Sequence, residues 1–456
     1  MKNTRNTILL AAFASGLMAL VWAQAPGDPL ERGFQNPPDS AKPRTWWHWT
    51  GGNVTKDGIT KDLEWMKRVG IGGMHLADVS SGSGQTVEKK IVFGTPEWLD
   101  AVRHAVSEAD RLGLEMTIFS SAGWSETGGP WVKPEQAMKK LVWSETVVEG
   151  TRSFGGKLAQ PPSNNGPIRN LRTGGGRGGS GAPPPDPTYY GDSAVLAYRT
   201  PADEVKMADL RPLATTNAGP IDAAALLDDD LNTAVTIAAP AGGGPAWLQY
   251  EFAQPFQARA ISLAGRGIPV GRVLASGDGA NFRTLVTMPG PQGYRGGSVR
   301  TFAFPEVTAR FFRVELDAAP LTPAATMAGG PVVPAKEYTL TEAVLHSGGR
   351  VDRWEDKAAF SLLFEYETVP TPAVAPAAQI RRSDIIDLTP RMSKDGTLNW
   401  EVPAGKWTIL RMGYSLTGSK NRPAPPSGLG YEADKLSRKY MEAYFHVYID
   451  PIAQAL

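Results

Sequence analysis

The sequence contains no cysteine, and its charges nearly cancel, with 47 lysine and arginine residues against 46 aspartate and glutamate residues. The lack of cysteine excludes disulfide bonds and metal sites built from thiolates. The charge balance argues against nucleic acid or an anionic membrane as the main partner, because both attract a basic surface. With 456 residues, the chain is long enough for two or three domains.

Long apolar runs are also scarce, and the clearest one lies at the N-terminus. Lys2 and Arg5 precede the apolar run Ile8–Ala23, and Ala23-Gln24-Ala25 has the small-x-small form of a signal peptidase site. A membrane anchor is the alternative, but about 16 residues are few for a bilayer span. We therefore expect residues 1–25 to be a cleaved signal peptide, with no membrane span afterwards. The mature protein would be exported, to the bacterial periplasm or the extracellular space.

Residues 26–150 alternate between strand-like and helix-like patterns. The expected strands are 45–49, 72–79, 114–121 and 141–149, and the expected helices are 59–70, 96–112 and 134–140. Thr95 followed by Pro96 has the form of a helix N-cap with proline in the first turn. Alternating strands and helices with short connections predict a parallel sheet. We therefore expect an α/β fold and the first part of a (β/α)8 TIM barrel.

The pattern changes after residue 150. Residues 151–220 combine a low-complexity loop, which includes GGGRGGSGAPPPDP, with a connecting segment. Residues 221–320 contain short alternating strands between glycine and proline turns, which predicts an antiparallel β-sandwich of the jelly-roll kind. Residues 321–456 return to mixed strand and helix and end in a helical pattern over 435–456. We expect this last segment to return to the barrel domain and to be truncated at its end.

Polar and aromatic residues follow each of the first three expected strands, where the active site of a TIM barrel lies. These residues are His48, Trp49, Gly51, Gly52 and Asn53 after the first strand, Asp78, Ser80 and Ser81 after the second, and Ser120, Ser121, Trp124, Glu126 and Trp131 after the third. Tryptophan rings cover the apolar faces of sugars, while carboxylate, imidazole and amide groups bind sugar hydroxyls. The clusters therefore favour a carbohydrate ligand.

Two alternatives remain open for these residues. Trp46 and Trp49 would pack between the sheet and its helices if they face the core, because alternate residues of a strand point to opposite sides. Independently of this, His48 and His75 are each either a hydrogen-bonded structural histidine, which the sequence favours, or a ligand-binding group.

Acidic residues elsewhere allow two interpretations. Glu432 and Asp434 precede the last helix, where they would bind hydroxyls or a cation, or would only complement the helix dipole. Residues 228–232, DDDLN, would form either a calcium loop or a solvated turn. The sequence has no evident metal-binding histidine pair, nucleophilic serine elbow or phosphate-binding loop.

Four segments, taken together and in order, resemble the α-L-rhamnosidases of glycoside hydrolase family 106. The segments are TWWHWTGGNVTKDGITKDLEWMKRVGIGGMHLADV, AGWSETGGPWVKPEQAMKKLVWSE, LTPRMSKDGTLNWEVPAGKWTILRMGYSLTG and PAPPSGLGYEADKLS. The segment with LLDDDLNTA, ASGDGANFRTL and ARFFRVEL resembles galactose-binding-like (discoidin-type) domains.

The resemblance implies a (β/α)8 catalytic domain with an inserted sandwich, inverting hydrolysis of terminal α-L-rhamnosides, and a calcium ion (Ca2+) near the sugar hydroxyls. Inversion requires one carboxylic acid and one carboxylate. In the family both follow the block that matches GLGYEADKLS and its helix, so we expect them beyond Leu456 and assign no catalytic residue here. The chain alone would then be inactive or poorly soluble unless a partner chain completes the barrel.

The sequence thus predicts an exported glycosidase acting on an oligosaccharide or polysaccharide. The candidate substrate-binding residues are His48, Asp78, Trp124, Glu126, Glu432 and Asp434. One alternative is a non-catalytic carbohydrate-binding protein that works through its sandwich. Another is a related glycosidase with a different sugar specificity.

Overall fold

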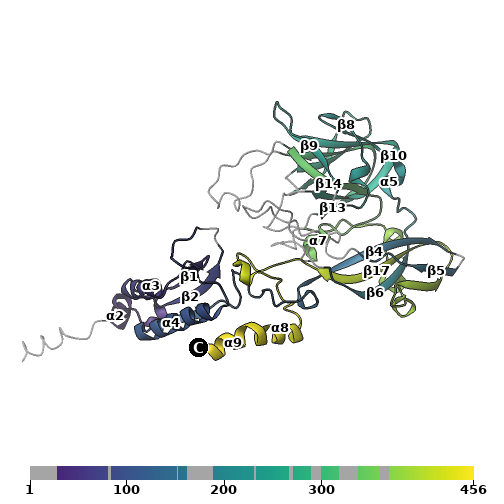
Figure 1. Cartoon of the computed structure of the whole chain (residues 1–456). Coiled ribbons are helices and arrows are strands. Elements are labelled where there is room, and N and C mark those ends of the chain that lie inside the picture. The colour runs from purple at the N-terminus through teal and green to yellow at the C-terminus, as the bar shows by residue number, and fades with distance from the viewer. Residues whose placement is uncertain are drawn as a thin grey trace, which may run out of the picture. The chain divides into compact units, whose positions relative to one another are not determined.

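The computed structural model describes residues 28–80, 84–150, 153–161, 188–230, 233–265, 271–288, 299–317, 337–358 and 369–456. The expected signal peptide and most of the low-complexity loop lie outside these ranges. The chain forms two compact units (Figure 1): the first extends to Met138 and resumes at Ser419–Leu456, and the second is Lys139–Gly418. Among the described residues, no helix is both long and apolar enough to cross a membrane.

The first unit contains a parallel sheet of three strands in the order β1-β2-β3. The strands are β1 (Arg44–Thr50), β2 (Gly73–Val79) and β3 (Glu115–Ile118). Helices α3 (Lys56–Arg68) and α4 (Pro96–Leu112) connect successive strands (Figure 1). The predicted alternation of strand and helix is confirmed up to β3, and a complete barrel stays a prediction.

The ends of α4 follow from its sequence. Thr95 accepts a hydrogen bond from the Trp98 main-chain N–H through its hydroxyl, and Pro96 occupies the first turn. Gly113 ends the helix in the left-handed conformation with φ 61°, which glycine adopts without a steric penalty. The helix buries Ala101, Val102, Ala105 and Ala109 on one side.

The helices cover one face of the parallel sheet. Trp47 and Trp49 of β1 are 6% and 3% exposed, and Trp47 Nε1 donates a hydrogen bond of 3.0 Å to Asp62 of α3. Trp46, which points to the opposite face, is 56% exposed. Core packing is therefore the correct interpretation for Trp49 but not for Trp46.

After residue 418 the chain returns to the first unit and ends in a helical segment beside α4. This segment is α8 (Arg438–Tyr444), a π-helical turn (Phe445–Ile449) and α9 (Asp450–Ala455). The Arg103 guanidinium of α4 donates a hydrogen bond of 2.6 Å to the main-chain carbonyl of Ala455. The predicted closing helix is confirmed, although it begins later than expected. A short helix, α2 (Pro29–Gln35), opens the unit.

Strand β4 (Lys139–Glu149) begins the second unit, and its role differs from the prediction. It was expected as the fourth parallel strand, but it pairs antiparallel with β17 (Lys406–Leu416) along its whole length. The expected helix 134–140 is only a 3-10 turn at Pro134–Gln136. The alternating side-chain pattern specified a strand, but it carries no information on the partner strand.

The remaining strands of the second unit form three antiparallel sheets. A four-stranded sheet runs β15-β6-β17-β4, a two-stranded sheet pairs β16 with β5, and an eight-stranded sheet joins β7 to β14. The bounds are β5 Ser153–Lys157, β6 Tyr190–Arg199, β7 Leu213–Thr216, β8 Gly219–Ile221, β9 Val235–Ala238, β10 Ala246–Gly265, β11 Gly271–Ser276, β12 Arg283–Met288, β13 Val299–Leu316, β14 Glu337–His346, β15 Ile386–Asp387 and β16 Thr397–Glu401, with short helices α5 Met207–Leu210 and α7 Trp354–Lys357.

The eight-stranded sheet encloses the largest described core, which includes Leu248, Tyr250 and Phe312. The antiparallel pairing expected for 221–320 is confirmed, and the jelly-roll sandwich stays a prediction. The expected return to the barrel at residue 321 is wrong, because β14 to β17 belong to the antiparallel sheets of this unit.

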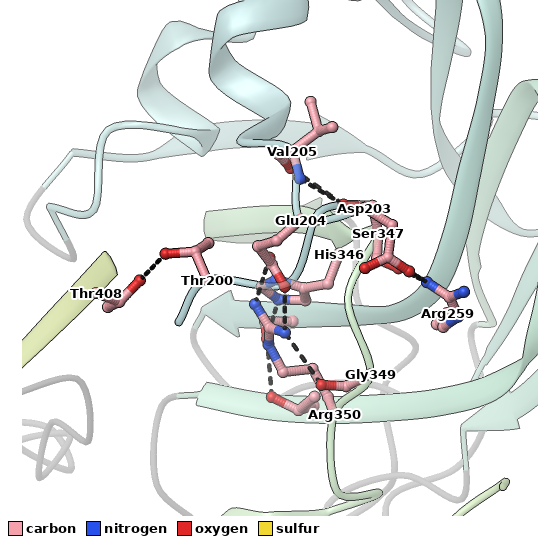
Figure 2. Close-up of polar contacts among 12 residues, drawn as sticks. Thr200, Asp203, Glu204, Val205, Arg259, His346, Ser347, Gly349, Arg350 and Thr408 are labelled. Atoms are coloured by element: carbon pink, nitrogen blue, oxygen red, sulfur yellow. Dashed lines mark hydrogen bonds and ion pairs between the residues drawn. The ribbon is translucent and has the colours of Figure 1, made fainter. Parts of the chain in front are cut away.

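The segment Thr200–Val205 leads from β6 toward the eight-stranded sheet and is fixed by polar contacts (Figure 2). The hydroxyl groups of Thr200 and Thr408 lie 2.8 Å apart. Arg350 donates two hydrogen bonds, of 2.9 and 3.1 Å, to the two carboxylate oxygens of Glu204. Such a paired guanidinium and carboxylate combines charge with a fixed geometry, so the connection between the sheets of this unit is not a free linker.

Candidate functional site

Exposed aromatic rings gather on the face of the parallel sheet that the helices leave uncovered. Trp46 is 56% exposed and Trp124 is 52% exposed, and their ring centroids lie 6.1 Å apart. Phe119 meets Trp46 edge to face at 5.7 Å and stacks on His75 at 3.9 Å. We call Trp46, His48, His75, Phe119 and Trp124 the aromatic cluster.

Strand register brings this cluster together. In the β1-β2 pair, Trp46 lies opposite His75. In the β2-β3 pair, His75 lies opposite Thr117, and Phe119 follows two residues later on the same side. Trp124 reaches the cluster from the loop after β3. The loop is held by a hydrogen bond of 3.0 Å from the Trp124 main-chain N–H to the Arg422 carbonyl.

Two of the predicted site residues, His48 and Trp124, are in direct contact. The Trp124 indole N–H donates a hydrogen bond of 3.0 Å to His48 Nε2. The rings of Trp46 and His48 meet edge to face at 5.5 Å. Burial lowers the pKa of the neighbouring His75, which favours its neutral form. The cluster therefore presents large apolar rings together with the hydrogen-bonding imidazoles of His48 and His75.

Asp78, the third predicted residue, lies on the helix-covered side of β2. It is 7% exposed, and its Oδ2 accepts a hydrogen bond of 2.6 Å from the Trp98 indole N–H of α4. Burial raises the pKa of Asp78 to about 7, although the hydrogen bond from Trp98 acts in the opposite direction. The Asp78 side chain therefore points to the opposite side of β2 from His75.

A small cavity borders Asp78 at the ends of β2 and β3. Its lining residues are Leu76, Asp78, Phe93, Trp98, Ile118, Phe119, Ser121 and Tyr448. The cavity thus includes Phe119 of the aromatic cluster, Asp78 of the covered face and Tyr448 of the π-helical turn. π-Helical turns inside helices occur frequently at functional sites, and this one brings Tyr448 to the cavity.

Asn421 holds the loops around the cluster together. Its side-chain amide donates hydrogen bonds of 2.9 Å to the Ala122 carbonyl and 2.8 Å to the Gly428 carbonyl, and its oxygen accepts one of 2.9 Å from the Gly430 N–H. The side chain is 0% exposed. Three main-chain groups therefore depend on this one amide inside the first unit.

The remaining predicted residues do not join the cluster. Glu126 is exposed, and its main-chain carbonyl accepts a hydrogen bond of 2.6 Å from the Ser120 hydroxyl. Glu432 pairs with Lys435 at 2.6 Å. Asp434 accepts a hydrogen bond of 3.1 Å from the Leu436 main-chain N–H. This bond closes a turn that precedes α8, whose N-cap is Ser437.

Comparison with known proteins places this site in a family. Residues 35–456 match the sequence family of glycoside hydrolases 106, described as alpha-L-rhamnosidase. The chain belongs to glycoside hydrolase family 106. A solved rhamnosidase from Novosphingobium sp. PP1Y is 37% identical to it, with a TM-score of 0.75 over 94% of this chain. A protein of Formosa agariphila described as "Putative beta-glucuronidase" is 27% identical over 98% of this chain.

This family member spans only part of the length of those relatives. It covers 38% of the Novosphingobium rhamnosidase chain and 24% of the Formosa protein. The similarity therefore concerns the portion that contains the two units described above.

The calcium ion implied by the family resemblance finds no ready site among the described residues. Within those ranges, no group of three or more histidine, aspartate or glutamate side chains is arranged to hold a metal ion. In the DDDLN segment, the Asp228 carboxylate accepts hydrogen bonds of 2.9 Å from the Asp230 N–H and the Thr233 hydroxyl. These contacts are those of a turn closed by its own side chain.

Sequence reasoning did not single out Asn421, Phe119, Trp98 or Tyr448. Phe119 lay inside an expected strand, and its alternation with Thr117 was a usable signal for the uncovered face. Asn421 contacts Ala122 across 299 residues and Tyr448 contacts Phe119 across 329 residues, so no local pattern marked these two contacts. Ser81, named with the second cluster, lies outside the described residues.

Proposed function

We propose that this family member works as part of an exported α-L-rhamnosidase that hydrolyses terminal α-L-rhamnosides with inversion, and that its aromatic cluster contacts the sugar. Family membership and the 37% identity to a rhamnosidase support the reaction. Only the N-terminal pattern at Ile8–Ala23 supports export, and no described residue bears on it.

The observation that carries the proposed sugar contact is the exposure of Trp46 and Trp124. Single exposed apolar side chains are ordinary, whereas adjoining exposed rings form a patch of the kind that marks a binding surface. Here the two rings flank the hydrogen-bonding imidazole of His48. A pyranose offers the matching combination, because its C–H groups pack on a ring while its hydroxyls form hydrogen bonds.

The cluster does not supply the acid and the base. Inverting hydrolysis requires two carboxyl groups roughly 6.5–9.5 Å apart with room for water between them. Glu432 is paired with Lys435, and Asp78 lies on the helix-covered side of the sheet. That both catalytic carboxyl groups lie outside this chain stays a prediction. Turnover of an aryl α-L-rhamnoside by the purified chain alone would contradict it.

Calorimetric titration of the chain with L-rhamnose, with and without calcium, tests the proposed site. We expect binding that Trp46→Ala or His48→Ala weakens by about tenfold or more, which corresponds to about 1.4 kcal/mol. Trp65→Ala is the matched control, because Trp65 lies on α3 and is 51% exposed but does not belong to the cluster. Equal losses in all three variants, or no binding by the unaltered chain, would contradict the proposed sugar contact. An effect of calcium on L-rhamnose binding would support the calcium ion that the family resemblance implies near the sugar hydroxyls.

A different sugar specificity is the second candidate function. The description of the Formosa relative as a "Putative beta-glucuronidase" favours testing it. Hydrolysis of a panel of aryl glycosides by the protein would separate the two. Preference for an aryl β-glucuronide over the α-L-rhamnoside would overturn the rhamnose assignment. A purely binding role for the antiparallel sheets would instead leave L-rhamnose binding unchanged in Trp46→Ala.

A further inference from the structure

The hydrogen bond between Trp124 and His48 fixes which imidazole nitrogen carries the proton. An indole N–H can only donate, so His48 Nε2 must accept and therefore bears no hydrogen. A neutral imidazole with an unprotonated Nε2 carries its proton on Nδ1. We propose that Trp124 sets the Nδ1–H tautomer of His48, and that this Nδ1–H group donates a hydrogen bond to an oxygen of the bound sugar.

The partners are held in place independently of any ligand. The main chain around Trp124 is fixed by the bond from its N–H to the Arg422 carbonyl, 3.0 Å, and by the bond from Gly123 N–H to the Asp78 carbonyl, 2.7 Å. Gly123 has φ 81°, a conformation that favours glycine. His48 is fixed by the parallel register of β1 on β2, in which it lies opposite Ala77. The tautomer is therefore set by two anchored elements of the fold.

The other ring nitrogen is left for a ligand or for water. His48 is exposed, and among the residues that the structure describes none accepts a hydrogen bond from Nδ1. The flanking ring of Trp46 stands nearly perpendicular to the imidazole, with an interplanar angle of 83°. A sugar packed against an indole face would thus have one hydrogen-bond donor within the same cluster.

This arrangement supplies one hydrogen-bond donor beside the aromatic rings. A doubly protonated imidazole could not accept the bond from Trp124, so the bond and the free Nδ1–H donor both belong to the neutral ring. A hydroxyl or ring oxygen of a neutral sugar satisfies the donor without requiring a charge. The assignment of a sugar as the ligand rests on the proposed function, whereas the tautomer rests only on the geometry of the Trp124–His48 pair.

Nitrogen-15 NMR of the imidazole rings in the full chain tests the tautomer directly, at a pH where histidine is neutral. The sequence has five histidines, and loss of one signal set in His48→Gln assigns the residue. We expect a protonated Nδ1 and an unprotonated Nε2 for His48. We expect the pattern to change in Trp124→Phe, which keeps a ring but loses the donor, and to persist in the control Trp46→Phe. A protonated Nε2 on His48 in the unaltered chain would overturn the proposal. This outcome does not depend on whether any variant folds.

The proposed hydrogen bond from His48 Nδ1–H to the sugar is tested by adding L-rhamnose and, separately, D-glucuronate to the same sample. We expect L-rhamnose to shift the His48 Nδ1 signal. We also expect its dissociation constant to rise about tenfold in Trp124→Phe, a change of about 1.4 kcal/mol, which is the size of one hydrogen bond. Stronger binding of D-glucuronate than of L-rhamnose, or L-rhamnose binding that leaves the His48 Nδ1 signal unchanged, would overturn the proposed hydrogen bond to the sugar. Absence of binding by either sugar would contradict the proposed function. The tautomer is tested separately, because it is measured in the chain without a sugar.

Discussion

The carboxyl group of Asp78 illustrates how one buried residue changes the pH response of the fold. In an unfolded chain an aspartate titrates near its ordinary pKa of 3.8, whereas in the folded chain burial raises the pKa of Asp78 to about 7. Between these values folding takes up a proton, so the free energy of unfolding falls as pH rises. Above about pH 8 both states are ionised and the loss is complete.

Asp78→Asn removes this titration while its amide oxygen can still accept from Trp98. We expect the variant to lack the contribution of Asp78 to the loss of stability between pH 4 and pH 8, which is on the order of 4 kcal/mol for a group this deeply buried. Urea unfolding followed by tryptophan fluorescence at several pH values measures it. Identical pH dependence in the variant and the unaltered chain would show that Asp78 is ionised in both states.

At the scale of elements, local sequence signals located α3 and α4 but did not identify the partners of the strands. Thr95 and Gly113 mark the two ends of α4 because a cap is a local hydrogen bond or a local backbone conformation. Short strands were expected within residues 221–320, yet Ala246–Gly265 is the single strand β10, with a register shift between Glu251 and Phe256. Pro255 lies at this irregularity, where the ladder does not need its missing N–H.

Removing the N-cap of α4 tests how much this cap contributes to the free energy of unfolding. Thr95→Ala deletes the acceptor for the Trp98 N–H and should lower the free energy of unfolding by about 1 kcal/mol. Thr95→Ser keeps the hydroxyl and is the control. Chemical denaturation of both variants gives the measurement, and equal stabilities would mean that the cap contributes nothing.

At the scale of the whole molecule, segments far apart in sequence build the first unit. Asn421 joins the loop after β3 to residues 428–430, across a separation of 299 residues in the case of Ala122. The 280-residue second unit lies between these partners in the chain, since it occupies Lys139–Gly418. The loops of the candidate site are therefore positioned by a part of the chain that follows the inserted unit.

Asn421→Ala leaves three buried main-chain groups without this partner, and we expect it to destabilise the first unit by on the order of 3 kcal/mol. Asn53→Ala is the matched control, because Asn53 also bonds three main-chain groups but is only half-buried. Hydrogen exchange of the amides near Gly430 reports the effect. Protection equal to that of the unaltered chain would rule out a positioning role for Asn421.

The sequence by itself determined the local elements of the first unit, their order, the family and two members of the aromatic cluster, His48 and Trp124. Helix caps, side-chain periodicity and motif order act over a few residues, so they can be identified without coordinates. The tertiary structure decided what depends on distant partners: that β4 pairs with β17, that Asp78 faces α4, and that Asn421 and Tyr448 reach the site. Strand pairing and burial depend on which residues meet in space, and the same alternating pattern satisfies several partners.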